Sequence, residues 1–131
     1  MTTLVWLRDD LRTADHPALA AAASDPGGVV ALYVLDEASP GMRPLGGATK
    51  WWLHHSVRSL TASLAALGIP LVLRRGPAAR VVPEAVRASG AGRVLWNRRY
   101  GGAERQLDAA LKRELREQGV EVRSFLASLL F

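Results

Sequence analysis

Residues 4–19 read LVWLRDDLRTADHPAL, and the change of character within this stretch decides the fold. Four apolar residues, Leu4 to Leu7, have the length of a buried strand, and they run directly into Arg8-Asp9-Asp10. A helix is expected soon afterwards, because Asp15 is a favoured N-cap residue and Pro17 is tolerated in a first helical turn. A buried strand that ends in charges and is followed by a helix is typical of a β–α unit in a parallel sheet.

The same alternation of apolar runs and helical patterns continues along the chain. Strands are predicted at residues 4–7, 29–35, 69–73, 93–96 and 120–125. Helices are predicted at residues 15–24, 48–67, 78–89 and 103–118, the third with a restart at Pro83. The clearest helix carries one apolar stripe, formed by Leu53, Val57, Leu60, Leu64 and Leu67. The pattern predicts an α/β fold, a Rossmann-like five-stranded parallel sheet with helices on both faces.

Composition places broad limits on the class of protein. The chain has 131 residues, of which 49% are hydrophobic and 22% charged, so a single globular domain with a sizeable core is expected. It has no cysteine, which excludes a disulfide framework and a thiolate metal site and favours a cytoplasmic location. Its apolar runs are too short to span a membrane. The net charge of +5 leaves open a polyanionic partner such as DNA.

Charged and polar residues follow four of the predicted strands. Ligands of open parallel sheets bind beyond the carboxyl ends of the strands, so these residues are expected to meet at one rim. The four runs are Arg8-Asp9-Asp10, Asp36-Glu37, Arg74-Arg75-Gly76 and Asn97-Arg98-Arg99-Tyr100. Any strand becomes polar where it leaves the core, so the predicted ligand site rests on the convergence of four runs rather than on one.

Short catalytic motifs give no support for chemistry in this chain. No G-x-G-x-x-G follows the first strand, and the glycine-rich loop at 41–47 has Gly47 where a phosphate-binding loop needs lysine. His54 and His55 are neighbours on a helix and diverge by roughly 100°, which does not suit a shared metal ion. Trp6 and Trp96 are predicted to be core residues, whereas Trp51 and Trp52 open the long helix. We therefore predict neither catalytic residues nor a metal site.

Three stretches nevertheless resemble the DNA photolyase/cryptochrome family. They are residues 4–23 (LVWLRDDLRTADHPALAAAA), residues 46–60 (GGATKWWLHHSVRSL) and residues 94–131, beginning VLWNRRYGGAERQ. The resemblance implies a photolyase, an enzyme that uses light to split cyclobutane pyrimidine dimers in DNA. It implies that residues 1–131 are the N-terminal α/β antenna domain of that enzyme. FAD is then held by a C-terminal helical domain that is absent from this chain, so the chain alone is expected to be inactive.

The resemblance also implies which residues bind the antenna chromophore. Arg8 and Asp10 match the charged turn after the first strand, and Glu104 matches a glutamate that contacts folate in some members. Tyr33, Leu35 and Asp36 match the end of the second strand, which lines the deazaflavin or flavin pocket in relatives. Arg98 is expected to close a cleft with Tyr33 and Asp36. Ala103 stands where folate-binding members have asparagine, and Arg99 and Gly101 stand where deazaflavin-binding members have acids. The chromophore is therefore left open among deazaflavin, FMN and methenyltetrahydrofolate.

Other functions remain open beside the antenna. The domain could be a structural or interaction module of a cryptochrome-like protein that holds no antenna and packs against the C-terminal FAD-binding domain. An exposed apolar patch that included Trp51 or Trp52 would support that alternative. A general nucleotide-binding α/β enzyme is the third hypothesis, and the missing phosphate-binding motifs argue against it. The expected partners are the FAD-binding domain of the parent protein and, through it, DNA; no membrane partner is expected.

Overall fold

The computed structural model describes residues 2–7, 17–23, 27–35, 47–97 and 102–125. Side chains are described throughout these ranges except at Pro17, at Ala23, at 47–54 and at 102–104. None of the helices in these ranges is long and apolar enough to cross a membrane.

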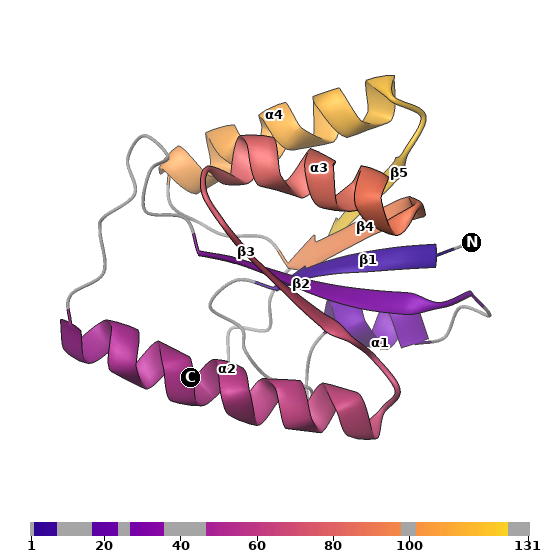
Figure 1. The fold of residues 1–131 in the computed structure, drawn as a ribbon. Helices are drawn as coiled ribbons and strands as arrows, with labels where there is room; N and C mark the ends of the chain where they lie inside the picture. Colours follow the sequence, from indigo (N-terminus) through magenta and orange to yellow (C-terminus); the bar gives the residue numbers. More distant parts are fainter. Residues whose placement is uncertain (1, 8–16, 24–26, 36–46, 98–101, 126–131) are drawn as a thin grey trace.

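The described residues form five strands that alternate with four helices (Figure 1). The elements are β1 (Thr2–Leu7), α1 (Pro17–Ala23), β2 (Val29–Leu35), α2 (Gly47–Ala66), β3 (Leu71–Arg75), α3 (Ala78–Ser89), β4 (Ala91–Asn97), α4 (Gly102–Glu117) and β5 (Glu121–Phe125). The strands are all parallel and lie in the order β3-β2-β1-β4-β5. The chain thus winds outward from β1 in both directions, and the predicted Rossmann-like fold is confirmed.

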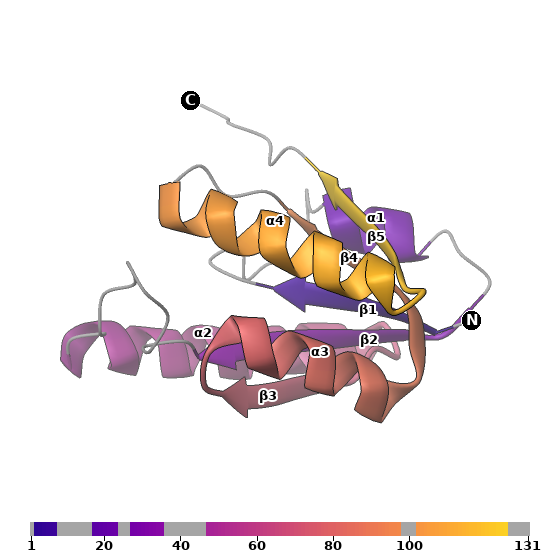
Figure 2. The same ribbon diagram turned by 90° about the horizontal axis from the view of Figure 1, so that it is seen from above.

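Each face of the sheet is covered by two helices, as the two views show (Figure 2). Side chains alternate between the faces along a strand, so neighbours in β1 and β4 belong to different cores. Trp6 and Trp96 face α3 and α4, where their rings meet edge to face with centroids 5.4 Å apart. Leu7 and Leu95 face α1 and α2. The prediction that Trp6 and Trp96 are core residues is confirmed.

The predicted strand at 69–73 was placed two residues too early, and the end of α2 shows why. Gly68 has a left-handed φ of 75°, and the amide of Ile69 donates to the carbonyl of Leu64 at 2.9 Å. This arrangement is a Schellman motif, and it keeps Ile69 in the turn, where its side chain is buried beside that of Leu64. Leu67, predicted on the core-facing stripe, is instead 63% exposed because the helix has ended at Ala66.

Other boundaries agree closely with the sequence patterns. The observed β2 and α3 have the predicted bounds, and Pro83 lies within one continuous α3 rather than at a restart. Val57, Leu60 and Leu64 form the buried stripe of α2, and Leu111 and Leu115 form that of α4. Arg74 and Arg75 differ from expectation, since they are the last residues of a strand instead of the loop that follows it.

Candidate functional site

The strand order places a ligand site at one position on the rim of the sheet. Chain connections leave β1 and β4 in opposite directions, and a crevice forms beyond the carboxyl ends of such strands. β1 ends at Leu7 and β4 ends at Asn97. The described residues around these two positions therefore define the candidate site.

Five residues, one from each strand, form a row across this end of the sheet. Pairing aligns Asn97 with Phe125, Leu7 with Tyr33, and Tyr33 with Leu73. Leu7 falls beside Asn97, one step beyond the pair Trp6–Trp96. Residues aligned in parallel strands project to the same face, and this face is the one covered by α1 and α2. We call Phe125, Asn97, Leu7, Tyr33 and Leu73 the carboxyl-end row.

Side-chain exposure increases along the carboxyl-end row from Asn97 to Leu73. Asn97 and Leu7 are fully covered, Tyr33 is partly exposed, and Leu73 is 53% exposed. The Tyr33 ring therefore sits between a dry aliphatic surface and an open one. An aromatic ring in such a position offers a face on which a planar group can stack.

Asn97 fixes the helix that covers the buried end of the row. Its Oδ1 accepts a hydrogen bond from the amide of Ala18 at 3.2 Å, although the two residues are 79 positions apart. An amide of the first helical turn has no intrahelical partner, so Asn97 acts as a remote cap for α1. We had predicted Asp15 as the cap, and Asp15 lies outside the described residues. The sequence feature that could have indicated this role is an amide side chain directly after a predicted buried strand.

Two of the predicted chromophore contacts fall within the described residues. Tyr33 and Leu35 alternate with the buried Leu32 and Val34, so they share the face of the carboxyl-end row. The Leu35 carbonyl accepts a hydrogen bond from the Gly76 amide at 3.1 Å, which ties the ends of β2 and β3 together. The other predicted contacts, Arg8, Asp10, Asp36 and Arg98, lie outside the described residues. Glu104 belongs to the first turn of α4, and its side chain is not among those described, nor are those of Trp51, Trp52 and His54.

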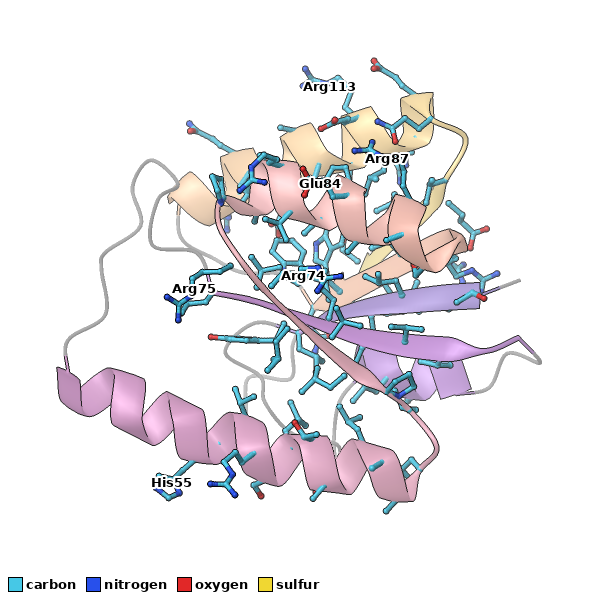
Figure 3. The ribbon with its side chains drawn as sticks, in the orientation of Figure 1. His55, Arg74, Arg75, Glu84, Arg87 and Arg113 are labelled. Carbon is cyan, nitrogen blue, oxygen red and sulfur yellow. The ribbon has the colours of Figure 1, made fainter. Side chains whose placement is uncertain are left out.

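The turn after β3 completes the described rim. Gly76 has a φ of 130°, and a Cβ atom built there would lie 2.5 Å from Nη2 of Arg80 and 3.2 Å from Cγ2 of Val81. The φ value favours glycine at this position, because an L side chain rarely adopts it, whereas the Arg80 side chain can move aside. Arg74 and Arg75, which precede this turn, are exposed (Figure 3).

The described side chains of the candidate site are suited to binding a ligand. They supply an aromatic ring, an amide and aliphatic surfaces, which hold and orient a ligand. Within the ranges that the structure describes, no three His, Cys, Asp or Glu side chains gather closely enough to hold a metal ion.

Comparisons with known proteins agree with this architecture. The family model described as DNA photolyase matches residues 3–131. A deoxyribodipyrimidine photo-lyase of Agrobacterium fabrum is 44% identical over 127 residues, which cover 97% of this chain and 26% of that protein. Cryptochrome-1 of Arabidopsis thaliana is 37% identical over 130 residues, which cover 98% of this chain and 19% of that protein.

Solved structures show the same fold. A bacterial class III photolyase from Agrobacterium tumefaciens superposes with a TM-score of 0.84 at 44% identity, over 95% of this chain and 25% of that one. A cryptochrome from Synechocystis superposes with a TM-score of 0.85 at 27% identity, over 95% of this chain and 27% of that one. The chain thus spans about a quarter, or less, of the length of these relatives.

Proposed function

The chain belongs to the DNA photolyase family, and from that premise we propose that residues 1–131 form the antenna-chromophore-binding domain of a deoxyribodipyrimidine photolyase. The whole protein would repair cyclobutane pyrimidine dimers in DNA with the energy of light. A C-terminal domain would hold FAD and the damaged DNA, and the present domain would supply excitation energy to that FAD. The 131 residues would not repair DNA by themselves.

The observation that carries the proposal is the position of Tyr33 in the carboxyl-end row. An antenna has to hold a planar pigment in a fixed orientation, which requires a rigid stacking surface. β2 provides that surface, because it is a central strand paired on both sides. The neighbouring Leu7 is buried under the helices, whereas Leu73 leaves the other side open. A pigment ring could therefore pack against Tyr33 from the open side.

The charged candidates would complete the site through their chemistry. Arginines such as Arg8 and Arg98 suit the phosphate of FMN or the carboxylates of a folate tail, since guanidinium groups form paired hydrogen bonds with both. Asp10, Asp36 and Glu104 would accept hydrogen bonds from ring or side-chain donors of the pigment. Tyr33 and Leu35 would contact the ring itself. The pigment is proposed to be a deazaflavin, FMN or methenyltetrahydrofolate.

One observation favours a second candidate function. Leu67 and Leu73 are the large apolar side chains most exposed in the described part of the chain, at 63% and 53%. Exposed apolar groups near one edge of a sheet suit packing against another protein surface. The alternative is therefore a structural module of a cryptochrome-like protein that contacts a neighbouring domain and holds no pigment.

A titration of the 131-residue chain with each of the three pigments separates these functions. Saturable changes in pigment absorbance and fluorescence are expected for one pigment. Tyr33→Ala should weaken that binding about tenfold or more, whereas Tyr33→Phe, which keeps the ring, should retain most of it. Asp36→Ala tests the charged part of the site. Equal binding by Tyr33→Ala and the unaltered chain would refute the stacking role, and no binding of any pigment would favour the structural module.

A further inference from the structure

The two edges of the sheet differ in how their strands are covered. At β5, Lys112 of α4 donates to the hydroxyl of Ser124 at 2.6 Å, and Arg116 donates to the carbonyl of Val122 at 3.2 Å. At β3, the described hydrogen bond from a side chain to a strand carbonyl comes from the strand itself. Arg74 donates to the carbonyl of its neighbour Leu73 at 3.3 Å. Figure 2 shows β3 at the margin of the sheet with no described element beyond it. Among the described elements, β3 is therefore the edge strand that no other element covers, and we call it the open edge.

The register shows which backbone groups of β3 point outward. The Pro70 carbonyl accepts from Ala31, and the Gly76 amide donates to Leu35, so both ends of the ladder face β2. Alternate residues of a parallel strand bond to the same neighbour. The even-numbered residues therefore face β2, and the amides and carbonyls of Leu71, Leu73 and Arg75 face away from it. Such a row of donors and acceptors is a template for a further strand.

The side chains at this edge combine apolar surface with positive charge. Leu73 is 53% exposed, and Arg74 and Arg75 are exposed beside it. Figure 3 shows these two arginines at the end of β3, pointing in different directions. Charged residues on an edge strand oppose its pairing with another copy, because like charges then meet.

The positive charge extends beyond the strand. Residues 55–92, which include the end of α2, β3 and α3, contain five arginines and one glutamate, a net charge of +4. That segment accounts for most of the +5 of the whole chain. The glutamate, Glu84, pairs with Arg80 at 3.4 Å. Arg58, Arg74, Arg75 and Arg87 form no ion pair with the described carboxylates, and their charges attract an anionic partner.

We propose that the outer edge of β3 binds an extended acidic segment of another protein chain, which adds to the sheet as a sixth strand. The partner's backbone would pair with Leu71, Leu73 and Arg75. An apolar side chain would pack on Leu73, and carboxylates would pair with Arg74 and Arg75. To do so it must displace the 3.3 Å bond from Arg74 to Leu73, which is long and exposed.

The backbone groups favour a peptide over a nucleic acid. A phosphate backbone offers acceptors to the outward amides but no donors to the outward carbonyls of Leu71 and Arg75. An extended peptide supplies both. A second copy of the chain would also supply both, but its own arginines would come to lie against this basic edge. This binding uses the outer backbone groups of β3, and its test contains no pigment, so its outcome is separate from that of the pigment titration.

Fluorescence anisotropy with a labelled peptide tests the proposal on the 131-residue chain. The probe is a fluorescein-labelled nonapeptide that alternates valine and glutamate. Its controls are the same peptide with a central proline, which lacks an amide donor, and the same peptide with lysine in place of glutamate. We expect saturable binding of the probe, weakened by added salt, and binding at least about tenfold weaker for both controls.

Variants of the chain separate backbone pairing from charge. Leu73→Pro removes the outward amide, and the fold should tolerate it because proline is accepted where an edge amide faces outward. Leu73→Ala keeps that amide and is the matched control. We expect Leu73→Pro to bind the probe at least about tenfold more weakly than Leu73→Ala. Arg75→Glu should weaken binding, whereas Arg113→Glu, an equal charge change on α4, should not.

Several results would overturn the proposal. One is the absence of saturable binding, and another is equal binding of the valine–glutamate and proline-containing peptides. Tighter binding of a DNA duplex that Leu73→Pro leaves unchanged would instead indicate a nucleic-acid surface. Self-association abolished by Leu73→Pro would indicate a second copy. Should circular dichroism show that Leu73→Pro does not fold, the comparison of Arg75→Glu with Arg113→Glu decides, and equal binding by these two variants contradicts the proposal.

Discussion

Replacement of Asn97 by alanine tests how α1 is held over the candidate site. The variant removes the 3.2 Å acceptor of the Ala18 amide, at a position where Asn97 is 2% exposed. Loss of an N-cap costs about 1 kcal/mol, and a buried amide left without a partner costs about 1–3 kcal/mol. Because these two costs describe the same lost hydrogen bond, they are not added, and we expect the free energy of unfolding to fall by about 2 kcal/mol. For a chain of this length that corresponds to a fall in Tm of about 8 °C.

Urea unfolding followed by circular dichroism measures this change. Gln106→Ala is the matched control, since it removes an amide side chain that is exposed on α4 instead of buried at a helix cap. Asn97→Asp keeps an acceptor at a helix N-terminus and should lose less stability than Asn97→Ala. The reasoning fails if Asn97→Ala costs less than about 0.5 kcal/mol, the range of ordinary surface substitutions, or no more than Gln106→Ala.

Two further changes probe the turn after β3 and the end of α2 by urea unfolding. Gly76→Ala should cost about 1–3 kcal/mol, because it places an L side chain at a φ of 130° and 3.2 Å from Cγ2 of Val81. Gly28→Ala, with nothing within 4 Å, is the control, and equal costs would contradict the argument. Leu64→Ala should cost about 2–5 kcal/mol and Leu67→Ala less than about 0.5, since the first is buried and the second exposed. Similar losses for both leucines would show that the helix ends elsewhere.

Most of the fold could be predicted from periodicity, because each element buries one continuous apolar pattern. The β-branched run of β2 and the α3 pattern gave correct bounds. The β3 boundary could not be predicted in the same way. Ile69 is apolar and β-branched, yet its amide closes the α2 cap, and this three-dimensional requirement outweighs its strand propensity.

The candidate site was less predictable than the fold. Strand ends could be located from the sequence, and β2 ends at Leu35 as expected. The contact of Tyr33 and Leu35 with a pigment stays a prediction that rests on the family resemblance. The capping contact of Asn97 to Ala18 joins segments 79 residues apart, and no local pattern reports such a contact. The open edge of β3 could not be predicted either, because the position of Arg74 and Arg75 on an edge strand follows only from the strand order.

The most direct test of the antenna proposal is the fluorescence anisotropy of a pigment bound to the 131-residue chain. A pigment held rigidly on Tyr33 tumbles with the whole domain, so its anisotropy should rise to the value set by the protein. Tyr33→Ala should lower the bound fraction, whereas Leu67→Ala, an exposed substitution outside the carboxyl-end row, should not. An anisotropy that never rises with deazaflavin, FMN or methenyltetrahydrofolate, or one that rises equally in Tyr33→Ala, would contradict the account.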